Sequence, residues 1–284
     1  MANNPRFTRI TIVGLGVIGG SYAKALSALG YTVFGVDRDE QTCELAVRTG
    51  AVAKASDTPA EFFGNSDLIV FALYPSQIAD YLHENLDAIA QNCVLTDVAG
   101  LKSHFVSRIR NSLAGRPDLQ FVFCHPMAGR EKRGFAYADP AVFRGANFII
   151  TPTQDATQET IARIEALAIE MGFGRIKRIS PEEHDKRIAF TSQLPHAMAV
   201  ALVNSDTRND TGAFIGDSYR DLTRIANINE DLWTQLFLEN KDNLVVELDA
   251  FASRLQDIRD AVASSDAQAL RGYFVSATEK RKKL

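Results

Sequence analysis

The segment that most constrains the fold is a glycine-rich turn between two short β-forming runs. Residues 9–13 are mostly β-branched and lead into a GxGxxG pattern formed by Gly14, Gly16 and Gly19. A helical run, 22–29, follows, and a second β-forming run, 31–36, ends at Asp37. A strand, glycines, a helix, a strand and an acid about 20 residues after the first glycine are typical of a dinucleotide-binding unit.

Each glycine has an expected role in that unit. The first permits the tight turn, the second lets the backbone approach a pyrophosphate, and the third lets the helix pack closely on the strand. We expect the phosphates to lie on the helix N-terminus, against Gly14, Gly16, Val17, Ile18 and Gly19. Asp37 is expected to bind ribose hydroxyls, which favours NAD over NADP because a 2′-phosphate would face a carboxylate. Arg38 leaves an alternative open, since it could stack on adenine, pair with a phosphate or remain a solvated loop charge.

The same alternation continues to about residue 179. Further β-forming runs, separated mainly by helical patterns, cover residues 67–73, 94–98, 121–126, 147–151 and 175–179. This predicts an α/β fold with a Rossmann-type, doubly wound parallel sheet. Asp97 is expected at a strand exit, either orienting the nicotinamide end of the cofactor or capping the next helix. Lys102 is expected near a ligand carboxylate or on the surface of the first turn of that helix.

The character of the chain changes at residue 180. Ser180, Pro181 and Glu183 predict a helix start with a capping box. Beyond it the patterns are helical, over 184–202, 219–225, 229–263 and 266–279. We therefore predict two domains, 1–179 for the dinucleotide and 180–284 as an all-α domain. Its apolar faces exceed what a short bundle can bury alone, which predicts a homodimer through the helices.

The candidate catalytic residue in the first domain is His125. Residues 121–123 are β-formers, and Pro126 is expected to end the strand, leaving His125 at its carboxyl end, where open parallel sheets bind ligands. An imidazole there can accept a proton near neutral pH. The alternative is a structural histidine that satisfies a loop carbonyl.

Composition excludes several other classes of protein. The net charge is −4 and the basic run Lys280–Lys283 is most simply a solvated tail, so a nucleic-acid surface is not expected. Three scattered cysteines favour a reducing compartment and exclude a cysteine-rich metal site, and no metal is expected. No apolar run is long enough for a membrane span or a signal peptide, so a cytoplasmic protein is expected.

Several motifs resemble the prephenate dehydrogenase family, which includes the arogenate and cyclohexadienyl dehydrogenases of tyrosine synthesis. They are the glycine turn at 14–21, Thr96-Asp97-Val98, the HPMAG motif at 125–129, Ser192-Gln193-Leu194-Pro195-His196, and 220–226. The resemblance implies a Rossmann domain, a helical dimerisation domain, NAD as cofactor, and oxidative decarboxylation of a cyclohexadienol. It also implies a base at His125 and a clamp for the ring carboxylate at Arg224. His196 would contact the substrate from the helical domain, and Arg220 and Asp221 would support that side of the site or the dimer contact.

The chain departs from the family pattern in two places. Gly100 replaces a frequent serine, which removes a hydroxyl beside the substrate or His125, and Arg130 replaces a frequent threonine. Arg130 could bind the side-chain carboxylate of the substrate or pair with Glu131 at the entrance. The choice between prephenate and arogenate, the strictness for NAD, and inhibition by tyrosine stay open. Rival interpretations are a β-hydroxyacid dehydrogenase and a non-catalytic NAD-binding sensor.

Overall fold

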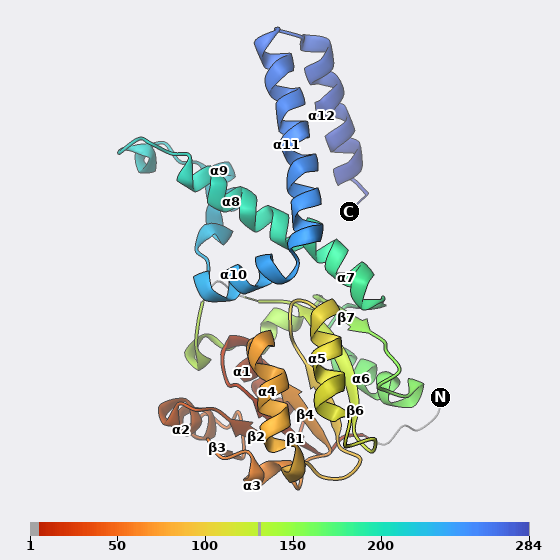
Figure 1. The fold of residues 1–284 in the computed structure, drawn as a ribbon. Helices are drawn as coiled ribbons and strands as arrows, with labels where there is room; N and C mark the ends of the chain where they lie inside the picture. Colours follow the sequence, from red (N-terminus) through yellow and green to blue (C-terminus); the bar gives the residue numbers. More distant parts are fainter. Residues whose placement is uncertain (1–5, 130–131, 284) are drawn as a thin grey trace.

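A computed structural model describes residues 6–129 and 132–283 of the chain. Within these residues, an eight-stranded sheet carries helices on both faces, and a group of helices follows it (Figure 1). The strands are β1 Arg9–Val13, β2 Thr32–Val36, β3 Lys54–Ser56, β4 Leu68–Phe71, β5 Val94–Asp97, β6 Gln120–Met127, β7 Asn147–Thr151 and β8 Arg175–Arg178. The helices are α1 Val17–Ala28, α2 Glu40–Arg48, α3 Ala60–Phe63, α4 Pro75–Asn85, α5 Ser103–Leu113, α6 Gln158–Glu170, α7 Pro181–Ile188, α8 Leu194–Asn204, α9 Asp217–Thr223, α10 Glu230–Glu239, α11 Lys241–Ala263 and α12 Ala267–Arg281.

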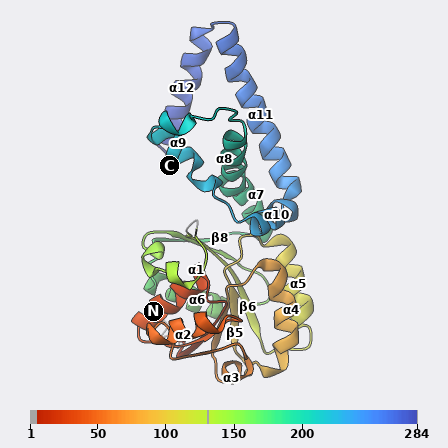
Figure 2. The same cartoon turned by 90° about the vertical axis from the view of Figure 1, so that its left-hand side faces the viewer.

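The strand order is β3-β2-β1-β4-β5-β6-β7-β8, and the ladders from β3 to β6 are parallel. The chain reverses its winding direction between β1 and β4, which is the position where open α/β sheets bind ligands. One apolar cluster, with α1 and α6, covers one face of the sheet, and another, with α4 and α5, covers the other (Figure 2). The predicted α/β class and Rossmann-type arrangement are confirmed, as is the helical region after the sheet.

The sheet is not wholly parallel, however. β7 runs antiparallel to β6, and β8 is parallel to β7. A parallel connection needs a crossover of about a dozen residues or more, usually a helix. The described part of the link between β6 and β7 instead holds two 3-10 turns, Phe135–Tyr137 and Pro140–Phe143. The prediction of a parallel strand at 147–151 was therefore wrong in direction.

The expected end of β6 at Pro126 was also wrong. The strand runs to Met127, with His125 opposite Ile149 and Pro126 opposite Phe148 on β7. On its other side, the register with β5 extends from Gln120 to Val122. His125 thus lies on a part of β6 that extends past the end of its β5 ladder.

The helical region departs from the expected long helices at two points. The run expected over 184–202 is divided by a π-helical turn, Ala189–Gln193, with Pro195 in the first turn of α8. The run expected over 229–263 is divided at Asn240 into α10 and α11. The capping of α7 is as predicted on one side, since the Ser180 hydroxyl accepts the Glu183 N–H. α11 and α12 project away from the sheet as an antiparallel pair (Figures 1 and 2).

A small apolar cluster joins the two regions. Leu101, Ile188 and Leu236 form its buried centre, with Met127, Leu232 and Trp233 around it. These residues come from the β5–α5 link, β6, α7 and α10. The carboxyl edge of the sheet therefore faces α7 and α10 across the space that holds the candidate site.

Candidate active site

The glycine turn has the shape that a dinucleotide requires. Gly14 has a φ of +88°, and a Cβ there would lie 2.6 Å from the Ala72 carbonyl oxygen. A Cβ at Gly19 would lie 1.8 Å from the Gly14 oxygen, so both positions exclude larger residues. A Cβ at Gly16 would meet nothing within 4 Å, and Gly16 lines a cleft together with the first α1 residues, Val17 and Ile18. This leaves open space in front of the α1 N-terminus, where backbone N–H groups bind phosphate.

Asp37 lies at the carboxyl end of β2 beside this turn. One carboxylate oxygen, Oδ2, accepts the Leu15 N–H at 2.7 Å, and Oδ1 accepts the Asp39 N–H at 3.0 Å. The side chain therefore fixes the turn as well as standing at the position expected for a ribose ligand. Arg38 is exposed and lines a neighbouring hollow beside α2 and β3.

A cleft of about 450 Å³ runs from the glycine turn to α10. Of the predicted site residues, it brings together Gly16, Val17, Ile18, Gly100 and His125. An adjoining hollow is lined by His125 with His196 and Arg224. The two spaces share His125, Trp233, Ser192, Lys132 and Arg133, among other residues, so they form one continuous site.

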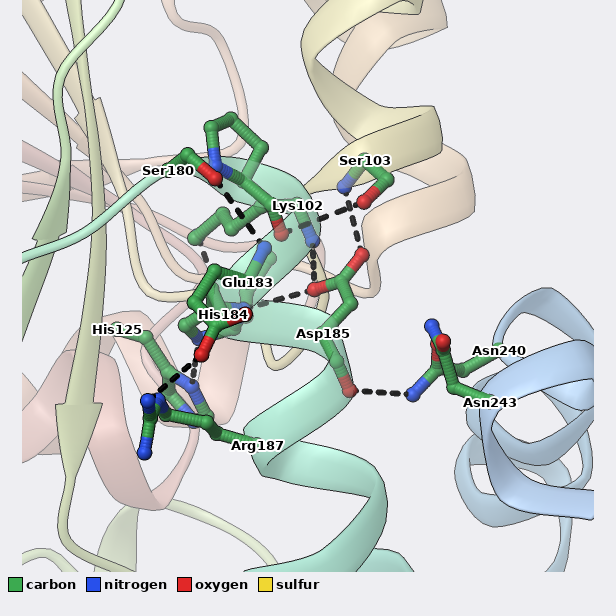
Figure 3. Close-up of polar contacts among 12 residues, drawn as sticks. Lys102, Ser103, His125, Ser180, Glu183, His184, Asp185, Arg187, Asn240 and Asn243 are labelled. Atoms are coloured by element: carbon green, nitrogen blue, oxygen red, sulfur yellow. Dashed lines mark hydrogen bonds and ion pairs between the residues drawn. The ribbon is translucent and has the colours of Figure 1, made fainter. Parts of the chain in front are cut away.

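His125 is held by a series of hydrogen-bonded side chains from α7 (Figure 3). Its Nδ1 lies 3.0 Å from Nε2 of His184, and His184 Nδ1 lies 2.7 Å from Asp185 Oδ1. Asp185 in turn accepts the N–H groups of Lys102 at 2.9 Å and Ser103 at 2.8 Å, at the N-terminus of α5. Figure 3 shows Asp185 between that terminus and Asn240, whose side-chain amide donates to the Asp185 carbonyl at 2.9 Å.

This series of hydrogen bonds fixes the tautomers of His184 and His125. The pKa of Asp185 is lowered despite its burial, because His184 and Ser103 donate hydrogen bonds to the carboxylate. An ionised carboxylate can only accept, so Nδ1 of His184 carries the proton and its Nε2 accepts. Nδ1 of His125 is therefore the donor to His184, and the remaining nitrogen of a neutral His125, Nε2, carries a lone pair.

The surroundings keep both imidazoles neutral. Burial lowers the pKa of His125 well below 6.5, and the nearby His184 and Lys102 lower it further. Burial also lowers the pKa of His184, against the effect of Asp185, which raises it. A neutral His125 with an unprotonated Nε2 is a proton acceptor at physiological pH.

Asp97 and Lys102 form an ion pair beneath the cleft, and neither side chain is exposed. Asp97 also accepts the N–H groups of Ala99 at 2.8 Å and Cys124 at 3.1 Å. This position does not favour the predicted contact between Asp97 and a cofactor. The expectation of a surface position for Lys102 was wrong, because its side chain is fully buried. Its expected place near a ligand carboxylate stays a prediction.

His196 stands on the helical wall of the site. Its Nδ1 donates to the Ser192 carbonyl at 2.8 Å, and its ring stacks on Trp233 with 3.6 Å between centroids. A hydrogen bond to its own helix is thus compatible with a place for His196 on the wall of the hollow. Arg224 is exposed to the hollow from the 3-10 turn Arg224–Ala226 after α9.

Other predicted residues lie elsewhere. Arg220 pairs with Asp217 at 3.2 Å, and neither Arg220 nor Asp221 lines the cleft or its adjoining hollow. Arg130 and Glu131 lie outside the described residues. Among the residues that the structure describes, no group of three or more His, Cys, Asp or Glu could hold a metal ion.

Sequence reasoning assigned neither His184 nor Trp233 to the site. The one available signal for His184 was its place in the first turns of a capped helix, next to Asp185. Lys132 and Arg133, which line the cleft and the hollow, were also missed. Arg133 pairs with Glu230 of α10 at 2.9 Å, across the entrance between the sheet domain and the helices.

Comparisons with known proteins agree with this arrangement. Residues 22–176 match the family "Prephenate dehydrogenase, nucleotide-binding domain", and residues 180–276 match "Prephenate dehydrogenase, dimerization domain". The chain is 29% identical to a prephenate dehydrogenase of Bacillus subtilis, covering 96% of this chain and 75% of that one. It is also 29% identical to a cyclohexadienyl dehydrogenase of Zymomonas mobilis, covering 97% and 95%.

A solved structure with a similar fold is prephenate dehydrogenase from Aquifex aeolicus in complex with hydroxyphenyl propionate and NAD⁺. It is 26% identical, the match covers 99% of both chains, and the TM-score is 0.88. Within the described residues, no helix is long and apolar enough to cross a membrane.

Proposed function

Since the chain belongs to the prephenate dehydrogenase family, we propose that it catalyses the NAD-dependent oxidative decarboxylation of prephenate to 4-hydroxyphenylpyruvate in tyrosine biosynthesis. The observation that carries this proposal is that His125 of the sheet domain and Arg224 of the helical domain line the same hollow. A proton acceptor and a carboxylate-binding guanidinium are the two groups that this chemistry requires of the protein.

The residues present fit NAD. The open space at Gly16, the N-terminus of α1 and the carboxylate at the end of β2 together suit a pyrophosphate and a ribose. When bound, NAD⁺ would supply the acceptor for the hydride that leaves the hydroxyl-bearing ring carbon. Asp37 favours it over NADP, because a phosphate on the ribose would face a negative charge.

His125 would act on the ring hydroxyl. Its Nε2 is the unprotonated nitrogen and can accept the hydroxyl proton as the carbon is oxidised. The positive charge that then forms on His125 is stabilised through His184 by the ionised Asp185. The chain of contacts thus orients the acceptor and supports the charge it gains.

Arg224 would hold the ring carboxylate until it leaves as CO₂. A guanidinium binds a carboxylate through two parallel hydrogen bonds, which fixes the ring as well as attracting it. His196 and Trp233, stacked on each other, offer a flat wall beside the same space. Lys132 and Arg133 add positive charge, which suits the second carboxylate of prephenate.

A second candidate substrate is arogenate, which carries an amino group on its side chain. The Glu230 carboxylate lines the hollow and could attract that amino group. The similarity to a cyclohexadienyl dehydrogenase is compatible with use of both substrates. Arg133 would thus favour the second carboxylate of prephenate, whereas its partner Glu230 would favour the amino group of arogenate.

The test is to mix the purified protein with NAD⁺ and either prephenate or arogenate and to follow NADH by absorbance. We expect turnover with both cofactor and substrate present, with a higher kcat/KM for prephenate. A higher kcat/KM for arogenate would show that arogenate, and not prephenate, is the preferred substrate. NAD⁺ binding without turnover of either compound would favour the non-catalytic sensor.

The family description of the second domain also supports a homodimer, which we propose forms through α8, α11 and α12. Large apolar side chains on these helices are exposed in the single chain: Leu202, Val203, Val245, Val246, Leu255, Ile258, Val262, Tyr273, Phe274 and Val275. A monomer rarely exposes so many together, so a second copy is the expected cover. The domain boundary near 179 and the cytoplasmic location stay predictions.

A further inference from the structure

The part of β6 that carries His125 needs support that the sheet does not supply on its β5 side. The β5–β6 register extends to Val122, three residues before His125. At Cys124, the N–H is bound by the Asp97 carboxylate at 3.1 Å and the carbonyl by the Lys102 ammonium at 2.6 Å. A buried ion pair therefore takes the place of the neighbouring strand next to the candidate base.

Lys102 uses all three of its ammonium protons in this arrangement. They go to Asp97, to the Ala99 carbonyl at 3.0 Å and to the Cys124 carbonyl. The side chain is fully buried, so solvent does not compete for these bonds. Its position is fixed by three bonds and in turn fixes the strand backbone.

The backbone of the same residue supports the other partner of His125. The Lys102 N–H donates to Asp185 Oδ1 at 2.9 Å, and that oxygen also accepts from Nδ1 of His184 (Figure 3). Lys102 thus supports His125 in two ways. Its ammonium group binds the carbonyl of the neighbouring Cys124 on β6, and its N–H binds Asp185, which holds His184 on α7.

We propose that Lys102 is a positioning residue for His125, which it acts on through Cys124 and through the Asp185–His184 pair. The charged groups that face it are Asp97 on β5, His125 on β6, and His184 and Asp185 on α7. The positive charge of Lys102 disfavours a proton on His125 or His184. Lys102 therefore also keeps His125 unprotonated and able to accept a proton. The inference rests on the proposed function for its effect on catalysis, but its geometric part does not require turnover.

Replacing Lys102 alone would leave Asp97 buried and unpaired, which could unfold the protein. The test therefore uses the double variant Asp97→Asn, Lys102→Met, which removes both charges and keeps side-chain volume and the oxygen that accepts from Cys124. We expect NAD⁺ affinity within about twofold of the wild type and a kcat lower by roughly 10- to 100-fold, as for a misplaced catalytic group. The acid limb of the pH profile should move to higher pH.

A second measurement is independent of activity. The ring resonances of His125 and His184 are followed by NMR as a function of pH, with His125→Asn and His184→Gln used for assignment. We expect both rings to titrate at higher pH in the double variant than in the wild type. A protein that turned over neither substrate would refute the proposed function and still leave this titration to decide the present proposal.

The matched control is Arg116→Met, which removes another ion pair that binds backbone carbonyls. Arg116 pairs with Asp118 at 2.8 Å and donates to the Leu86 carbonyl at 2.7 Å, before β5 begins. We expect it to lower the melting temperature without moving the histidine titrations. If the double variant keeps the wild-type kcat and titrations, Lys102 is merely the counter-ion of Asp97 and the proposal fails. A lower kcat with unchanged titrations would also overturn it.

Discussion

At the scale of single residues, His125 is the side chain on which the proposed chemistry depends most. Its Nδ1 is committed to His184, which leaves Nε2 for the substrate. We predict that His125→Asn retains substrate binding and loses about 10²- to 10⁴-fold in kcat, the usual contribution of a general base. Steady-state kinetics measures this, and a kcat equal to that of the wild type would exclude His125 from proton transfer.

Arg224 should act on binding more than on the chemical step. A charge-assisted contact with a carboxylate is worth roughly 1.5–3 kcal/mol, so Arg224→Ala should raise KM by about 10- to 100-fold. Arg220→Ala is the matched control, because Arg220 is nearby, exposed and paired with Asp217 outside the cleft. An equal rise in KM for both variants would mean that general charge, rather than a specific clamp, attracts the substrate.

Gly100 offers a test of the departure from the family pattern. A Cβ there would meet the Leu236 side chain at 3.5 Å, an ordinary contact, so a small side chain fits. We predict that Gly100→Ser keeps the melting temperature and raises kcat/KM, because the hydroxyl can donate in the cleft. Gly100→Ala is the control without a donor, and an equal gain from alanine would show that the hydroxyl is not the cause.

At the scale of elements, the contact between β6 and α7 should make stability depend on pH. The pKa values of His125 and His184 are both lowered, chiefly by burial, whereas unfolded histidines accept a proton near pH 6.5. Just below that pH the unfolded chain binds more protons than the folded chain, so the free energy of unfolding falls as pH decreases.

We predict a lower melting temperature at pH 5.5 than at pH 7.5, measured by calorimetry. In His184→Gln the difference should be smaller, because one of the two neutral imidazoles is absent. A melting temperature that does not change over this range would contradict neutral, buried imidazoles.

The elements also show how far sequence reasoning reaches. Local patterns predicted most strands, because buried strands and capped helices depend on nearby residues. They failed for the direction of β7, which depends on a connection without a crossover helix, and for the π-helical turn before Pro195. They also missed the burial of Lys102 and the contact of His184 with His125, because the Asp97–Lys102 ion pair and the contact between β6 and α7 are set by tertiary packing. The glycine turn and His125 could be predicted since their surroundings in the sequence are themselves distinctive.

At the scale of the whole molecule, the projecting helices should control assembly. Val246 on α11 is 64% exposed in the single chain and lies among the apolar residues proposed to meet a second copy. We predict that Val246→Glu shifts the protein from dimer towards monomer in analytical ultracentrifugation. Ile169→Glu, at a similarly exposed apolar residue of α6 in the sheet domain, should leave the mass unchanged. A dimer in both variants would place the interface elsewhere.

The paired imidazoles come from opposite sides of the boundary between the two regions, one from β6 and one from α7. Neither region alone would therefore carry the complete pair. A chimaera that joins this sheet to a helical region without a histidine at position 184 should keep nucleotide binding and lose turnover. A substitution in either half that breaks this contact would therefore act on the same proton acceptor.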